Sequence, residues 1–174
     1  MSQTQNEAVI SELLAGCIVD LLADYGVDAS PVVPPVSPSE MVSVVGFTSG
    51  EMRGNLAIAA TYDFFESTNV ISAQPTEEQV RDWAGELSNQ LLGRIKNRLL
   101  AYDLVLAMGT PMVITGLRMD VGKRRTGIAE RQAYLSSKGS IEAWFEATVE
   151  AGFVLEKNES AVDLSQSEGD LLFF

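Results

Sequence analysis

Histidine is absent from the 174 residues, and cysteine occurs only once, at Cys17. Without histidine, the chain cannot form a Ser-His-Asp triad or a Cys-His pair, lacks the commonest metal-ligating side chain and cannot carry out histidine phosphotransfer. A single cysteine cannot form an internal disulfide, and the leucines and isoleucine around Cys17 indicate a small buried side chain rather than a reactive thiol. We therefore expect no metal site, and much ordinary enzymology is excluded.

Long apolar runs and an excess of positive charge are also missing. No apolar stretch reaches the roughly 18 residues that a membrane-spanning helix needs, and the N-terminal residues lack the basic flank and apolar core of a signal peptide. The 12 Lys and Arg residues stand against 24 Asp and Glu, which gives a net charge of −12. Nucleic acid and anionic membranes would repel such a chain. The composition favours a cytoplasmic protein whose partner presents a basic or neutral protein surface.

Length and apolar content suit one globular domain with a short appendage. With 46% hydrophobic residues in the chain, residues 1–155 are expected to bury a sizeable core, and 156–174 to form an acidic tail. Four prolines within 30–39 predict an extended linker with no strand pairing of its own, although a ligand of a proline-binding domain is the alternative. The basic loop 122–127 is interpreted as a solvated hairpin tip, because its glycine spacing and Arg124 depart from a phosphate-binding loop.

Hydrophobic periodicity predicts both helices and antiparallel strands. Paired apolar residues recur every four positions in the first helix, which Gly26 ends, and turn residues separate the first two strands. In the short second helix, Phe64, Phe65 and Val70 are expected to point inward. The predicted elements are helices 7–24, 62–71 and 76–101, and strands 41–47, 52–61, 111–119, 131–137 and 140–149, with 152–155 prolonging the last. This pattern indicates an α+β fold, a mostly antiparallel sheet covered by helices.

The helix predicted over 76–101 carries the clearest local signals. Pro75 blocks an upstream start, and Thr76 is placed to cap the unpaired amide groups of the first turn, where acidic residues follow. Apolar side chains recur on one side at the spacing of a buried helix face. They are Val80, Trp83, Leu87, Leu91 and Ile95.

A narrow polar stripe lies opposite that apolar face. It consists of Asp82, Glu86, Asn89 and Gly93, at the same helical spacing. A solvated helix face usually pairs lysine with glutamate, yet this stripe has neither lysine nor arginine. A glycine inside a helix costs about 1 kcal/mol relative to alanine. The sequence therefore suggests that another chain or element lies close against Gly93, with an ordinary hydrated face as the alternative.

Three segments together resemble a known family. GFTSGEMRGNLAIAA, DWAGELSNQLLG and GTPMVITG look like the CheC/CheX/FliY family of chemotaxis phosphatases, most like its single-site CheX branch, over about 41–149. The family signature is an Asp or Ser, a Glu after three intervening residues, an Asn after two more, and a proline a little over twenty residues further on. Asp82, Glu86, Asn89 and Pro111 are similar to it in order and spacing. The resemblance implies a CheX-like (CheC-like) fold.

The resemblance also implies a substrate and residue roles. The activity would be hydrolysis of the aspartyl phosphate of a CheY-like response regulator, which supplies Mg²⁺ and a lysine, so that this chain needs no cofactor of its own. Asn89 would orient the attacking water, because an amide offers both a donor and an acceptor and phosphoryl transfer needs mainly positioning. Glu86 would pair with the regulator's lysine. Asp82 would support it, and Gly93 would let the regulator approach.

Other readings of the same chain remain open. The family resemblance implies a homodimer in which sheet edges meet, which suits an otherwise exposed edge strand. A rival to the phosphatase is a binding module or adaptor that docks a response regulator without hydrolysing anything. A third reading is a structural domain whose polar stripe is only hydrated.

Overall fold

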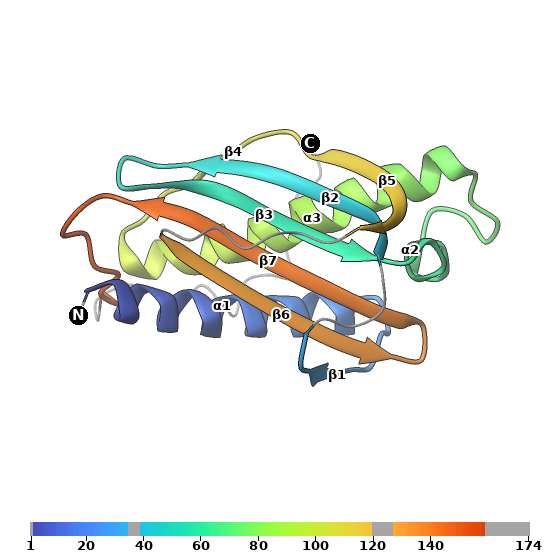
Figure 1. Ribbon diagram of the computed structural model, residues 1–174, viewed down its shortest axis with the longest axis horizontal. Helices are drawn as coiled ribbons and strands as arrows, with labels where there is room; N and C mark the ends of the chain where they lie inside the picture. The colour runs from blue at the N-terminus through green and yellow to red at the C-terminus, as the bar shows by residue number, and fades with distance from the viewer. Residues whose placement is uncertain (1, 35–38, 120–126, 159–174) are drawn as a thin grey trace.

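One antiparallel sheet of seven strands organises the computed structural model, which describes residues 2–34, 39–119 and 127–158. The strand order is β1-β6-β7-β3-β2-β4, and β5 pairs with β2 beside β4. Helices α1 and α3 lie together on one face of the sheet, and α2 lies at one end (Figure 1). The elements are α1 Ser2–Asp24, β1 Ala29–Val32, β2 Ser39–Thr48, β3 Met52–Ala60, α2 Tyr62–Thr68, α3 Glu77–Leu99, the 3₁₀ turn Leu100–Tyr102, β4 Ala107–Met108, β5 Met112–Met119, β6 Ile128–Ser136 and β7 Gly139–Val149. This arrangement confirms the α+β fold expected from the sequence.

The hairpin of β2 and β3 forms the middle of the sheet, as the sequence predicted. The Ser49 hydroxyl closes its turn by accepting hydrogen bonds from the backbone N–H groups of Glu51 at 3.1 Å and Met52 at 2.9 Å. Because side chains alternate along a strand, every second residue of β2 and β3 faces the helices. Phe47 of β2 stacks there on Phe145 of β7, with ring centroids 4.8 Å apart.

Helix α3 begins and ends close to where the sequence predicted. The Thr76 hydroxyl accepts from the Gln79 N–H, and the Gln79 side chain accepts from the Thr76 N–H, so that a capping box fixes the first turn. All five apolar residues predicted to face the core are at most 2% exposed. Burying a large apolar side chain stabilises the fold by roughly 1.5–3 kcal/mol, so this face holds the helix firmly on the sheet. Cys17 of α1 lies in the same core.

The proline-rich segment contradicts one prediction. Instead of a linker without strand pairing, Ala29–Val32 forms β1, which pairs antiparallel with β6 in the register Pro31↔Tyr134. Proline is tolerated because β1 is an edge strand with β6 as its one neighbour, so the missing N–H breaks no ladder on the outer side. Residues 35–38 of the predicted linker lie outside the described residues.

Contacts of Asn6 explain two further corrections. Helix α1 begins at Ser2, ahead of the predicted 7, and 152–155 does not prolong the sheet. The buried side chain of Asn6 accepts from the Leu155 N–H at 2.7 Å and donates to the Phe153 carbonyl at 3.0 Å. These bonds occupy backbone groups that a strand would use, and they anchor the polar first turns of α1 through tertiary contacts.

The remaining differences concern short elements. Helix α2 ends at Thr68 because the Asn69 side chain accepts from the Ile71 N–H at 2.8 Å, a local turn that competes with the helix. Val70 is therefore exposed rather than inward, whereas Phe64 and Phe65 are fully buried as predicted.

Strand β4 was not among the elements predicted from the sequence, and β6 begins earlier than predicted. In both places, backbone pairing with a neighbouring strand decides the structure: β4 pairs with the end of β2, and the first residues of β6 pair with β7. The basic loop 122–127, apart from Gly127, and most of the predicted tail lie outside the described residues. Within the described part of the chain, no helix is both long enough and apolar enough to span a membrane.

Candidate functional site

The polar stripe of α3 faces away from the core, as its spacing predicted. Asp82 and Glu86 are exposed, and Asn89 and Gly93 are partly exposed. They follow one another at helical spacing on the side opposite the buried apolar face, so the side chains of Glu86 and Asn89 are neighbours on the surface. A helix of 23 residues, anchored along its buried face, thus presents two carboxylates, one amide and one bare backbone position.

Gly93 has empty space where a side chain would stand. A Cβ built on Gly93 meets no atom within 4 Å. The element of this chain that the sequence suggested might lie against Gly93 is therefore not found among the described residues. The approach of another chain to Gly93 stays a prediction.

A buried polar contact joins the sheet to the turn of α3 that bears Asn89. The hydroxyls of Ser88 and Ser43 of β2 lie 2.7 Å apart, both fully buried, and the Ser88 hydroxyl reaches the Gly85 carbonyl at 2.8 Å. This contact fixes the turn of α3 that bears Asn89. Among the described residues, no hydrogen bond engages the Asn89 side-chain amide itself, so its donor and its acceptor both remain available.

Glu86 is held in place, in contrast to Asn89. The Gln90 amide donates to a Glu86 carboxylate oxygen at 2.8 Å, and the hydroxyl of Tyr25, just after α1, donates to the Gln90 carbonyl oxygen at 2.6 Å. The second carboxylate oxygen of Glu86 carries no bond among the described residues. Glu86 is therefore ordered and still able to accept from a partner.

The segment that bears Pro111 packs against α3 next to the stripe. A Cβ on Gly85 would lie 3.7 Å from both Pro111 and Val113, at ordinary van der Waals distance, so this segment and α3 lie close together here. The Gly109 N–H donates to the Gly46 carbonyl at 2.8 Å and ties the same segment to β2. The proline that the sequence singled out thus lies beside the turn of α3 that carries Glu86.

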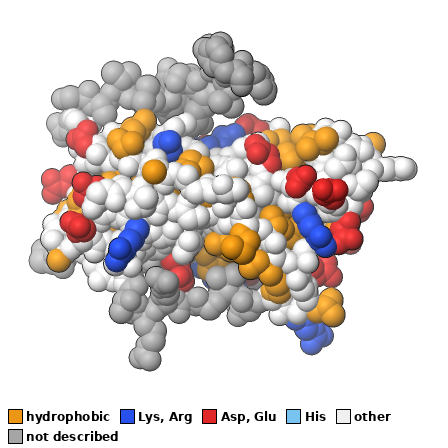
Figure 2. All heavy atoms as spheres, turned by 90° about the horizontal axis from the view of Figure 1, so that it is seen from above, with side chains coloured by type: hydrophobic (Ala, Val, Ile, Leu, Met, Phe, Trp, Pro, Cys, Tyr) orange, Lys and Arg blue, Asp and Glu red, His pale blue; other side chains and the backbone are white. Residues whose placement is uncertain are grey.

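Negative charge gathers at the N-terminal end of the stripe. Acidic residues of α2 and of the first turns of α3 lie at one end of the molecule, where Figure 2 shows acidic side chains grouped at the right. They are Asp63, Glu66, Glu77, Glu78, Asp82 and Glu86. Desolvation, together with the charges of Glu66 and Glu77, raises the pKa of the Tyr62 phenol. A basic partner surface would meet a favourable potential here.

The family model for chemotaxis phosphatase CheX matches residues 41–129, just over half of the chain. The chain belongs to the chemotaxis phosphatase CheX family. The stretch matched by the CheX model contains all but the first two residues of the β2–β3 hairpin, together with α3 and β5, and therefore the whole stripe and Pro111. No curated protein matches the chain.

Solved structures of CheX proteins share the fold. The chemotaxis protein CheX from Vibrio vulnificus has a TM-score of 0.68 at 20% identity, covering 78% of this chain and 93% of that chain. CheX from Desulfovibrio desulfuricans has a TM-score of 0.66 at 18% identity, covering 81% and 99%. A chain of the CheX-CheY-BeF3-Mg complex from Borrelia burgdorferi has a TM-score of 0.59 at 14% identity, covering 78% and 96%. At such identities these likenesses concern the fold.

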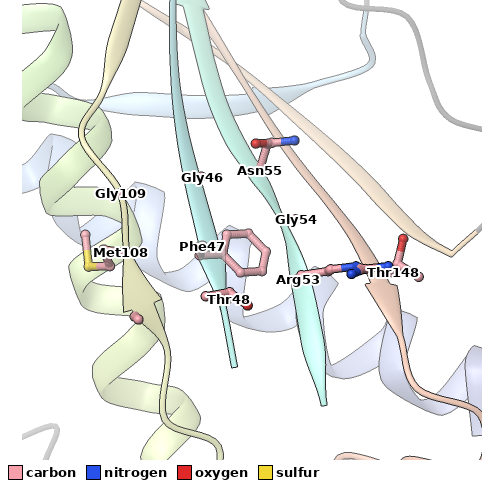
Figure 3. A pocket seen from close by; sticks show the side chains of 10 residues that line it. Gly46, Phe47, Thr48, Arg53, Gly54, Asn55, Met108, Gly109 and Thr148 are labelled. Atoms are coloured by element: carbon pink, nitrogen blue, oxygen red, sulfur yellow. The ribbon is translucent and has the colours of Figure 1, made fainter. Parts of the chain in front are cut away.

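The structure also contains an open depression away from the polar stripe of α3. It has a volume of about 490 Å³ and lies where β4 meets the ends of β2, β3 and β7 (Figure 3). Its lining includes Gly46, Gly54, Gly109, Arg53, Asn55 and Thr148, and none of its lining residues belongs to α3. The depression is thus separate from the stripe on α3.

Two neighbours of the stripe, Tyr25 and Gln90, were not predicted from the sequence. Gln90 follows Asn89 directly and donates a hydrogen bond to Glu86. Its side chain is oriented for this bond by Tyr25, which is 65 positions away in the chain. The one sequence signal for the bond between Gln90 and Glu86 was the spacing, a glutamine four residues after a glutamate on a helix. In the described ranges, no group of three or more His, Cys, Asp and Glu side chains is arranged to hold a metal ion.

Proposed function

We propose that this protein hydrolyses the aspartyl phosphate of a CheY-like response regulator and that the outward stripe of α3 is its catalytic surface. Membership of the chemotaxis phosphatase CheX family supports the activity. The observation that carries the assignment is the Asn89 amide, which has no hydrogen bond within the described residues and faces outward from a capped helix whose opposite face is buried. A CheX-CheY-BeF3-Mg complex from Borrelia burgdorferi, whose chain shares the fold, supports a CheY-like partner.

In the proposed reaction, water attacks the phosphorus atom as the bond to the aspartyl oxygen breaks. The products are the free regulator carboxylate and inorganic phosphate. Asn89 accepts a hydrogen bond from the attacking water through its carbonyl oxygen and donates to a phosphoryl oxygen through its amide nitrogen. Because the transition state is loose, positioning of the water contributes more than strong base chemistry does. This role needs no histidine.

Glu86 docks the regulator by pairing with its lysine, while the regulator's own Mg²⁺ neutralises the phosphoryl group. The free Glu86 oxygen is suited to an ammonium, since charge-assisted hydrogen bonds are the stronger kind. Asp82 extends the negative surface one turn upstream, and Gly93 leaves room for the partner's backbone. Because the regulator is an intracellular signalling protein, the proposal places this protein in the cytoplasm.

The test compares two asparagines on the same helix. Asn89→Ala should lower the phosphatase rate about 100-fold, in the range attributed to lost positioning, while the free energy of unfolding changes by less than about 0.5 kcal/mol. Asn97→Ala, an exposed position of α3 two turns later, is the matched control and should retain full activity. The measurement is the decay of phosphorylated regulator under each variant.

Two outcomes would overturn the assignment. An Asn89→Ala protein as active as the Asn97→Ala protein would remove the amide from the mechanism. A wild-type protein that forms a complex with the phosphorylated regulator but leaves the phosphate lifetime unchanged would be a binding module instead.

We further propose that the protein is a homodimer joined through the β5 edge of the sheet. The edge strand β5 exposes large apolar side chains, with Met112 at 65%, Ile114 at 46% and Leu117 at 89% exposure. Figure 2, which views the side where β4 and β5 lie, shows hydrophobic side chains gathered there. Such an edge is normally covered or paired. Leu117→Lys should convert the dimer to a monomer in light scattering, and a wild-type monomer would refute the proposal.

A further inference from the structure

A series of hydrogen-bonded side chains connects the end of α1 to the stripe on α3. Tyr25 is half-buried, and its hydroxyl donates to the Gln90 side-chain carbonyl oxygen at 2.6 Å. The Gln90 amide nitrogen donates to one Glu86 carboxylate oxygen at 2.8 Å. Glu86, Gln90 and Tyr25 thus form one continuous hydrogen-bonded series that ends at the proposed docking residue.

The three groups can form these two hydrogen bonds with only one assignment of donors and acceptors. An ionised carboxylate only accepts hydrogen bonds, so the Gln90 nitrogen must face Glu86. The Gln90 oxygen must then face Tyr25, whose hydroxyl can donate to it. The orientation of the amide is therefore set by its two neighbours.

Tyr25 is itself fixed from two sides. Its ring lies edge-on to Trp83 of α3, with centroids 4.9 Å apart and planes at 90°. The backbone around it closes the end of α1, since the Val27 N–H donates to the Leu22 carbonyl at 2.9 Å and Gly26 adopts a φ of 65°. An ion pair between Arg94 Nη2 and Asp24 Oδ2, at 2.5 Å, holds the same end of α1 to α3. The Tyr25 hydroxyl consequently has a defined position relative to the stripe.

We propose that Gln90 and Tyr25 are positioning residues that hold the Glu86 carboxylate ready to receive the basic side chain of the regulator. This inference rests on the proposed function of the stripe. A glutamate that is free to rotate loses conformational entropy when it docks, whereas a glutamate already ordered loses less. The series therefore acts on docking, and Asn89, which has no such support, acts on the chemistry.

The first test examines the free protein, without any regulator. Tyr25→Phe removes the hydroxyl and keeps the ring on Trp83, and Gln90→Met removes both hydrogen bonds at the same side-chain length. Each should shift the ¹³C resonance of the Glu86 carboxylate and leave that of Asp82 unchanged. Tyr134→Phe is the matched control, because its hydroxyl donates to the Ala15 carbonyl of α1 at 3.4 Å, away from the stripe.

The second test separates docking from chemistry in the regulator assay. Tyr25→Phe should raise KM about fivefold, the scale of one lost neutral hydrogen bond, with kcat within twofold of wild type. In a Glu86→Ala background the same change should have no further effect on KM, because the carboxylate that it positions is gone. Tyr134→Phe should leave KM unchanged in both backgrounds.

The outcomes distinguish this inference from the function on which it rests. A Glu86 resonance that does not move in Tyr25→Phe or Gln90→Met would overturn the positioning, whatever the activity. So would a rise in KM that persists in full when Glu86 is alanine. A wild-type protein that leaves the regulator's phosphate lifetime unchanged would overturn the proposed function, while the resonance measurement would still decide whether Glu86 is held.

Discussion

The outward stripe of α3 and the depression at the strand ends both contain glycine, but for different reasons. In the depression, a Cβ on Gly54 would stand 1.9 Å from the Glu146 carbonyl oxygen of β7, so the neighbouring strand requires the bare backbone. On the stripe, a Cβ on Gly93 would meet nothing within 4 Å. Internal packing accounts for the first glycine and leaves the second unexplained. We propose that the docked regulator, rather than this chain, requires the bare backbone at Gly93.

The largest expected effect is on the internally required glycine. Gly54→Ala should lower the free energy of unfolding by about 3 kcal/mol or more, because the added methyl would force β3 away from β7. Gly50→Ala, in the turn of the same hairpin with nothing within 4 Å of its Cβ, is the control and should change it by less than about 1 kcal/mol. Urea unfolding measures both. Equal midpoints for the two variants would show that the strands adapt and would erase the contrast with Gly93.

The next effect concerns the charge on the stripe. Glu86→Gln keeps the side-chain length and an oxygen for Gln90 to bind but loses the negative charge, so KM for the phosphorylated regulator should rise about tenfold with little change in kcat. Glu78→Gln removes an exposed charge from the first turn of α3 and should change KM less than threefold. Steady-state kinetics at fixed ionic strength compares them. Equal changes in KM would mean that only the net charge of the surface matters.

Gly93→Ala should separate stability from activity. Alanine is the better helix former, so the free energy of unfolding should increase by about 1 kcal/mol. If a partner approaches the bare backbone, the same methyl should raise KM severalfold. A more stable protein with an unchanged KM would instead mean that the glycine serves no partner.

The smallest effect is expected from the exposed side chains that line the depression. Arg53→Ala and Asn55→Ala remove exposed side chains that line it, and the rate of regulator dephosphorylation should stay within twofold of wild type. The measurement is again the decay of phosphorylated regulator. A tenfold loss in either variant would make the depression part of the functional surface.

Local signals in the sequence predicted α3 and the direction of its stripe. Thr76 and Gln79 form the cap, and the spacing of the apolar residues fixes which side is buried, so the outward position of Glu86 and Asn89 followed from short-range information. The β2–β3 hairpin was predicted for the same reason, because Ser49 and its neighbours close the turn locally.

Contacts between distant residues were out of reach of the sequence. The edge strand β1 exists because β6 lies beside it, and the early start of α1 depends on the bonds from Asn6 to the segment after β7. The bond from Tyr25 to Gln90 likewise joins α1 to α3. Periodicity shows which face of an element is buried, but it does not show which element covers that face.

The claim that this protein is a phosphatase acting through Asn89 is tested by the decay of phosphorylated regulator at a small molar fraction of this protein. The decay rate should rise in proportion to the amount of wild-type protein, each molecule should release many phosphates, and Asn89→Ala should return the decay to the regulator's own rate. A wild-type protein that leaves the decay unchanged, or an Asn89→Ala protein that accelerates it as well as wild type, would contradict the claim.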